Sequence, residues 1–198
     1  MEGDAQTGSL RWIPWCAVIV LGAITLVTHL GLLGYGSLPH EEAWRATWTY
    51  DLTLERARRF PPLWGCTYWL WQHAFGRSEF VLRLPTALAG LACVGLLYRF
   101  TVRRIGFWPA VLVAAVAAAH PALLVHSRTM KVFGIDALMT TVLIGVGLSA
   151  FRNPTSRRLY AFLVAGVAGM AFTFASVFVT AAWIPLIAWA CVKHRDST

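Results

Sequence analysis

Residues 60–101, FPPLWGCTYWLWQHAFGRSEFVLRLPTALAGLACVGLLYRFT, contain the two kinds of helix from which we expect this protein to be built. The first part opens with Pro61-Pro62, is rich in Trp and Tyr, and stops at Gly76. This is the Pro-first, Gly-last pattern of a short helix, and its aromatic side chains are typical of the membrane–water interface. The second part, residues 81–101, is almost wholly apolar, and a bilayer crossing needs about 20 such residues. The stretch predicts an interfacial helix followed directly by a membrane span.

The composition of the whole chain agrees with this prediction. Of its 198 residues 58% are hydrophobic and 13% are charged, and the mean hydropathy is +0.60, which is too apolar for a soluble surface throughout. We therefore expect one all-α integral membrane domain over residues 1–198, with about six transmembrane helices. The predicted spans are residues 12–34, 81–101, 107–125, 132–151, 159–174 and 176–192, so that five of them fall within residues 81–192.

A long polar loop, residues 35–80, separates the first two predicted spans. Its charged residues are too dense for a helix that faces lipid. Trp44, Trp48 and Leu52 recur at intervals of four, which predicts an amphipathic helix that starts just after Pro39 and lies on the membrane surface. Together with the helix that opens at Pro61-Pro62, the loop is predicted to contain two interfacial helices.

The orientation of the chain is predicted from basic residues in its short loops and tail, because such residues stay in the cytoplasm. These residues are Arg99, Arg103 and Arg104, then Arg152, Arg157 and Arg158, then Lys193 and Arg195. They predict a multi-pass inner (plasma) membrane protein with residues 1–11 and 193–198 in the cytoplasm and the long loop outside. The net charge of +8 is thus a topology signal, and no nucleic-acid partner is predicted because no basic stripe or binding motif accompanies it.

Glu41 and Glu42 are the first candidates for chemistry, because they stand where the first surface helix begins. A carboxylate beside an aromatic, water-excluding surface can act as a general base toward an acceptor hydroxyl. The alternative is structural, since carboxylates at a helix N-terminus are stabilised by the free N–H groups and the helix dipole.

Asp136 is the second candidate, because it lies about one turn inside the fourth predicted span. An acid within a membrane helix is costly and is therefore expected to face protein or water at a functional site. Arg128 and Lys131 precede it, and Arg128 would share a face with Asp136 if the helix extended that far back. A structural ion pair is the alternative.

A basic set completes the candidates: Arg56, Arg58, Arg59, Arg77 and Arg83. Arginines form charge-assisted, often bidentate bonds with phosphate, although anionic lipid headgroups would be bound equally well. Several His and Glu side chains could approach the same face, but none has the spacing of metal ligands, so no metal site is predicted and no cofactor is assigned.

Three segments carry a resemblance to a known family: LPHEEAWRA at residues 38–46, residues 60–91 of the stretch quoted above, and HPALLVHSRTMKVFGIDALMTT at residues 120–141. They resemble the N-terminal half of the integral membrane glycosyltransferases that use polyprenyl-phosphate sugars, the superfamily of protein O-mannosyltransferases and lipid A aminoarabinose transferases. The resemblance implies a GT-C-type fold and an inverting transfer of a sugar from a polyprenyl-phosphate donor to an extracytoplasmic acceptor.

Site roles follow from the resemblance position by position. Glu41 would stand at the family's catalytic base, Glu42 at the second acid, and Asp136 at the acid that opens the fourth span. The resemblance implies basic side chains that stabilise the departing lipid phosphate, and we assign this role to Arg58, Arg59 and Arg128. Glu41 is one methylene longer than the family's usual Asp, and residues 172–178, FTFASVF, differ from the Lys-Gly pair of many relatives.

Two other readings stay open. The chain could be a truncated, non-catalytic relative that serves as a structural or accessory subunit, in which case other membrane protein subunits would be its partners. A small transporter or channel is less well supported, because Asp136 is the one convincing buried charge along the predicted spans.

Overall fold

The computed structural model describes residues 13–31, 33, 39–51, 53 and 61–195. Within those ranges all regular secondary structure is helical, which confirms the predicted all-α class. The helices are α1 (Ile13–Leu30), α2 (His40–Tyr50), α4 (Pro62–Phe75), α5 (Glu79–Val102), α6 (Phe107–Ala119), α7 (Pro121–Ser127), α8 (Phe133–Arg152), α9 (Ser156–Phe172) and α10 (Ala175–Arg195).

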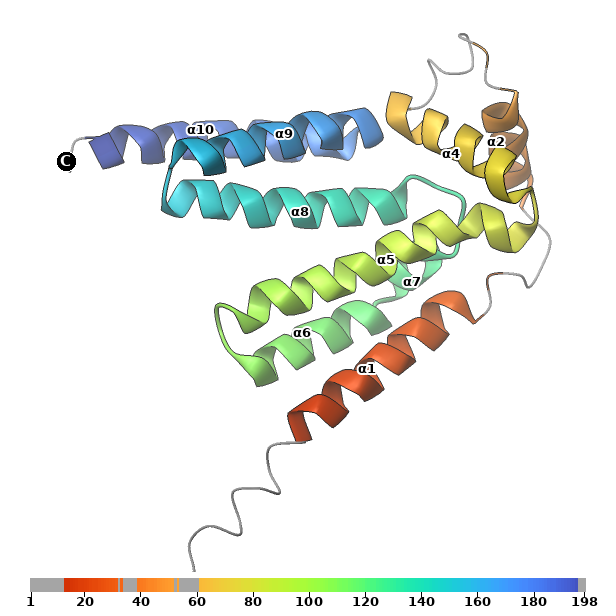
Figure 1. Ribbon diagram of the computed structural model, residues 1–198, viewed down its shortest axis with the longest axis horizontal. Coiled ribbons are helices and arrows are strands. Elements are labelled where there is room, and N and C mark those ends of the chain that lie inside the picture. The colour runs from red at the N-terminus through yellow and green to blue at the C-terminus, as the bar shows by residue number, and fades with distance from the viewer. Residues whose placement is uncertain (1–12, 32, 34–38, 52, 54–60, 196–198) are drawn as a thin grey trace, which may run out of the picture.

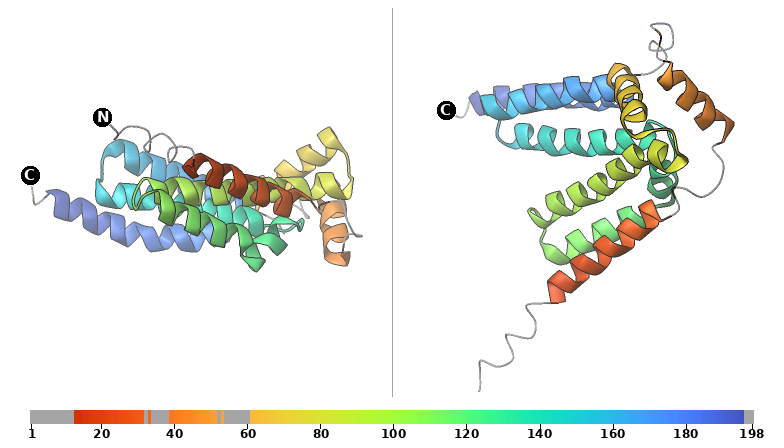
Figure 2. Two further views of the ribbon diagram at one scale, coloured as in Figure 1. Left: turned by 90° about the horizontal axis from the view of Figure 1, so that it is seen from below. Right: turned by 45° about the vertical axis from the view of Figure 1, so that its right-hand side comes forward.

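α2 and α4 lie across one end of a bundle formed by α1, α5, α6, α8, α9 and α10 (Figure 1). α5 and α8 are central: α5 packs against α6 and α8, and α8 packs against α9 and α10. Seen from below, the long helices form a flat, splayed bundle with α2 and α4 at one edge (Figure 2). We call this edge the α2–α4 end, and the edge where α8 and α10 finish the opposite end.

Three helices are long and apolar enough to cross a membrane: Glu79–Val102, Phe133–Arg152 and Ala175–His194. A fourth crossing results if α6 and α7 count as one span. The apolar part of α1, Cys16–Leu30, is shorter, and α9 has 17 residues with two arginines in its first turn. The chain is therefore a helical membrane protein, although by length and composition its described part supports three or four spans rather than six.

The prediction of one continuous span over residues 107–125 is wrong in one respect. α6 ends at Ala119, His120 has an extended backbone (φ −66°, ψ 122°), and α7 leaves at 58° to α6. Pro121 explains the break, because a residue before proline is driven out of the helical region and the proline ring has no N–H to donate.

The structure has a helix at each of the two predicted places in the polar loop, and the position of both helices at the membrane interface stays a prediction. α2 begins directly after Pro39, and α4 runs from Pro62 to Phe75 and ends at Gly76, whose φ of 90° favours glycine. Leu52 and residues 54–60 of the same loop lie outside the described ranges. α9 and α10 are separated by two residues, where the predicted spans 159–174 and 176–192 left one residue between them.

Specific contacts join α2 and α4 to the bundle. The side chain of Gln72 donates to the Thr49 hydroxyl at 2.6 Å, and the Trp71 indole donates to the carbonyl of Val81 at 2.8 Å. Trp64 and Tyr68 of α4 are fully buried in a core that α5 and α8 complete. α4 thus holds α2 and is itself held by α5, and Arg45 of α2 lines the same pocket as Phe133 and Asp136 of α8.

Candidate functional site

A charged pocket of about 360 Å³ opens at the α2–α4 end, beside the start of α8 and the α9–α10 turn. Its charged lining residues are Arg45 from α2, Lys131 from the α7–α8 connection and Asp136 from α8. Pro61, Phe133 and Phe174 are among its apolar walls. The pocket therefore combines two cations and one acid with an apolar surround.

Glu41 lies at the rim of this pocket, bonded to one of its lining residues. The Lys131 ammonium is 2.8 Å from Glu41 Oε2, and the Glu41 side chain is 67% exposed. The hydrogen bond from Lys131 lowers the pKa of Glu41, and the charges of Lys131, Arg45 and His40 lower it further. Glu41 is consequently an ionised, accessible carboxylate at neutral pH.

Glu42, the neighbouring acid, points the other way into the protein. Its carboxylate is 3.3 Å from Nε of Arg83, and the side chains are 1% and 8% exposed. Nη1 of Arg83 also donates to the carbonyl of Leu33 at 3.0 Å. The sequence analysis predicted that Arg83 belongs to an accessible phosphate-binding set, and this is wrong: Arg83 is buried and joins α2 and α5 to Leu33, which follows α1. Glu42 fixes the helix turn that presents Glu41.

Hydrogen bonds and packing fix the segment between α7 and α8 that contains Lys131. The Thr86 hydroxyl of α5 donates toward the backbone carbonyls of Arg83 and Thr129, at 2.8 and 2.9 Å. Met130 is fully buried in the core beside Trp64 and Tyr68. Burial raises the pKa of Tyr68, so its hydroxyl stays neutral. The position of Lys131 against Glu41 is thus set by packing between α4, α5 and α8.

Asp136 is in the first turn of α8, as predicted, and it lines the pocket. Its atom Oδ1 is buried without a hydrogen-bond partner, and the Thr173 side chain lies beside the carboxylate. A buried carboxylate oxygen without a partner is costly, so this atom is suited to receive a hydrogen bond from a bound molecule.

Arg128 does not share a helix face with Asp136, because α7 ends at Ser127 and α8 begins at Phe133. Its guanidinium instead donates from Nη2 to the backbone carbonyl of Thr28 in α1. The predicted pairing is therefore wrong, since the helix does not extend back to residue 128. Arg45 and Lys131 are the cations that line the pocket with Asp136.

The remaining predicted residues divide into two groups. Arg58 and Arg59, like Arg56, lie outside the described residues. Arg77 lies over the ring of Tyr50, on a different surface of the α2–α4 end. The sequence analysis missed Arg45, although its position four residues after Glu41 is the spacing at which two helical side chains meet. Among the described ranges no three His, Cys, Asp or Glu side chains converge as a metal site would require.

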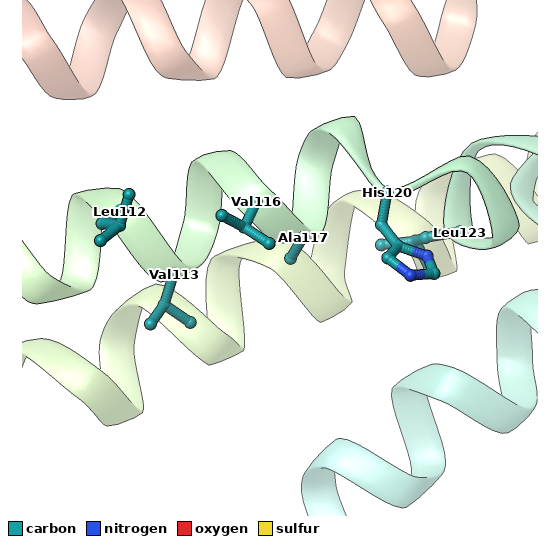
Figure 3. A pocket seen from close by; sticks show the side chains of 6 residues that line it. All are labelled: Leu112, Val113, Val116, Ala117, His120 and Leu123. Carbon is teal, nitrogen blue, oxygen red and sulfur yellow. The ribbon is translucent and has the colours of Figure 1, made fainter.

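A second hollow, of about 500 Å³, lies along α6 and the break before α7 (Figure 3). Its six lining side chains are Leu112, Val113, Val116, Ala117, His120 and Leu123. It is larger than the charged pocket, but its walls contain no acid and no permanent cation. An apolar hollow on a membrane helix is suited to lipid contact, so the charged pocket is the better candidate for chemistry.

An all-helical membrane protein with acids and cations gathered at one end of its bundle is the class that the resemblance predicts. The model of the dolichyl-phosphate-mannose-protein mannosyltransferase family matches residues 60–197, well over half of the chain. The chain belongs to this family, which is part of the GT-C superfamily of membrane glycosyltransferases. No curated protein and no solved structure matches it. The matched range contains Arg128, Lys131 and Asp136 but begins after Glu41 and Glu42.

Proposed function

We propose that this protein transfers a sugar from a polyprenyl-phosphate donor to an extracytoplasmic acceptor, at the charged pocket of the α2–α4 end. The observation that carries the proposal is the convergence of an ionised acid, Glu41, with two cations, Arg45 and Lys131, and a half-buried acid, Asp136. Family membership supports a glycosyltransferase-like function, and the donor class is the one the family name implies.

In the proposed reaction, Glu41 accepts the proton of an acceptor hydroxyl. The acceptor oxygen then forms a bond to the anomeric carbon of the sugar while the bond between that carbon and the phosphate oxygen breaks. The leaving lipid phosphate gains negative charge, and Arg45 and Lys131 are placed to stabilise it. Asp136 would orient the acceptor through its unpaired oxygen.

Lys131 has two roles in this scheme. It bonds to Glu41 before the donor binds, and it contacts the donor phosphate afterwards. When Lys131 turns to the donor phosphate, the carboxylate loses the bond that lowers its pKa. Its pKa then rises toward the ordinary value, and Glu41 becomes a stronger base in the presence of donor. Arg58 and Arg59 remain proposed phosphate contacts from the segment before α4, whereas Arg128 bonds to the carbonyl of Thr28 in α1.

The proposal requires the α2–α4 end to face the outside and both termini to face the cytoplasm. Cys66 of α4 is exposed and reports on this directly. A membrane-impermeant maleimide added to intact spheroplasts should label Cys66 in a variant in which the other three cysteines are serine. Labelling only after the membrane is opened would place the pocket in the cytoplasm and contradict the proposed orientation.

The test of the base is Glu41→Gln. Loss of a general base costs about 10²- to 10⁴-fold in rate, so transfer from a polyprenyl-phosphate sugar should fall by that factor while the unfolding temperature stays unchanged. Glu79→Gln is the matched control, because Glu79 is a half-exposed acid in the first turn of α5, outside the pocket. Undiminished transfer by Glu41→Gln would remove the residue from the catalytic role.

A second candidate function is a non-catalytic, accessory subunit of a larger membrane complex. The ion pair between Lys131 and Glu41 favours this function, because it gives the Glu41 carboxylate a structural partner in the absence of substrate. Purification in mild detergent separates the two: stoichiometric membrane partners together with no transfer by the wild type would decide for the accessory role.

A further inference from the structure

A second charged hollow lies between the last turns of α8 and α10. Both helices finish at the opposite end of the bundle (Figure 1). Its volume is about 380 Å³. The lining includes Phe151, Arg152, Pro154, Trp189, Lys193 and His194. None of these residues takes part in the site proposed above.

The charged side chains that line this hollow, among the residues that the structure describes, are all basic. Arg152, Lys193 and His194 are exposed. Between Asp136 and Asp196 the sequence contains no Asp or Glu at all, and Asp196 lies outside the described residues. Two permanent cations and one titratable imidazole around a common hollow provide a site for an anion.

Cations at the C-terminus of a helix have an ordinary structural role, because they oppose the negative end of the helix dipole. At the end of α8 another residue already takes this role: Nη1 of Arg158 donates to the carbonyls of Ser149 and Asn153, both at 3.4 Å. The helix end therefore has its own capping cation, and Arg152 is available to the hollow.

The hollow is also lined by aromatic side chains, and the exposed apolar surface continues beside it. The rings of Phe151 and Trp189 are stacked with centroids 5.9 Å apart, and the Lys193 ammonium lies 5.3 Å from the Trp189 centroid. Trp189 is 56% exposed and Val192 is 62% exposed. A ligand that fits this surface has an anionic head next to an apolar body.

We propose that the hollow between the ends of α8 and α10 binds the phosphate of an anionic phospholipid headgroup. Arg152 and Lys193 contact the phosphate, His194 adds a donor, and Trp189 packs against the glycerol and upper acyl carbons. Inorganic phosphate offers the same anion without the apolar body, so the test must separate the two sources.

The experiment measures lipid binding to the purified full chain in neutral detergent, by native mass spectrometry and by the unfolding temperature. Phosphatidylglycerol, phosphatidylcholine and inorganic phosphate are the three probes. The variant is Arg152→Gln with Lys193→Gln. Its control is Arg103→Gln with Arg104→Gln, which removes the same charge from exposed residues of the α5–α6 turn, outside this hollow.

Phosphatidylglycerol should bind the wild type and raise its unfolding temperature more than phosphatidylcholine does. Arg152→Gln with Lys193→Gln should bind phosphatidylglycerol about tenfold more weakly than the wild type does. The affinity of the control variant should differ from that of the wild type by less than about twofold. Equal losses in both variants would show diffuse surface charge and overturn the proposal. Full competition by millimolar inorganic phosphate would overturn the lipid assignment. If the double variant does not fold, Arg152→Gln and Arg103→Gln replace the double variant and its control, with the same expected and contradicting results.

Discussion

The two ends of the bundle both gather charge, but they do so differently. At the α2–α4 end acids and cations are interleaved, and the charges are either paired with each other or line a shared pocket. At the opposite end the charged residues that line the hollow, within the described ranges, are all basic. Mixed charge of this kind can move a proton and stabilise a leaving group, whereas charge of one sign can only hold an anion. The comparison explains why we assign chemistry to the first end and binding to the second.

The largest expected effect is on the free energy of unfolding. We expect the buried charge pair at the α2–α4 end to stabilise the fold and the exposed cations at the opposite end to contribute little. Glu42→Gln leaves Arg83 buried without its carboxylate, and breaking a buried pair costs about 3–5 kcal/mol. Lys193→Gln, an exposed change, should alter the free energy of unfolding by less than about 0.5 kcal/mol. Urea unfolding followed by tryptophan fluorescence compares the two. Similar small losses for both would show that Glu42 does not fix α2.

The next effect concerns the dual role of Lys131. Lys131→Gln removes a cation from the donor phosphate, and transfer should fall about a hundredfold. The same change removes the main cause of the lowered pKa of Glu41, so that pKa should rise. Transfer requires the ionised carboxylate, so its decline on acidification should begin at a higher pH in the variant than in the wild type. The measurement is the pH profile of the transfer rate.

Arg104→Gln is the control for Lys131→Gln, because it removes an exposed cation outside the charged pocket and should change neither rate nor profile. A profile of Lys131→Gln that coincides with the wild-type profile would contradict the proposed link between Lys131 and the base.

The smallest effect compares two glycines of α5, Gly90 and Gly95, whose surroundings differ. A methyl group on Gly90 would lie 2.8 Å from Cβ of Ser127 and 3.1 Å from Cδ2 of His29, where α1, α5 and α7 meet. Gly90→Ala should therefore cost about 1–3 kcal/mol through overpacking. At Gly95 a methyl group meets nothing within 4 Å, and Gly95→Ala should stabilise by up to about 1 kcal/mol through helix propensity. Thermal unfolding in detergent measures both, and a neutral Gly90→Ala would contradict the close packing.

Local sequence was enough to determine the membrane class, the helical content and the places of two helices in the polar loop. The helix after Pro39 and the helix that starts at Pro61-Pro62 are where the sequence predicts them, because proline, glycine and hydrophobic periodicity act over a few residues. The number of spans and the break between α6 and α7 were not predicted. Glu41 and Asp136 were also identifiable, since an acid at a helix start or inside a membrane helix stands out in the chain.

Only the tertiary structure decided which charges meet. Glu41 bonds to Lys131, 90 positions away, Glu42 to Arg83, 41 positions away, and Arg128 turns to α1 rather than to Asp136. Such pairs depend on how α2, α5 and α8 pack, and no periodicity along one helix contains that information. The family resemblance supplied the class of reaction, and the packing supplied the cations that the proposed reaction uses.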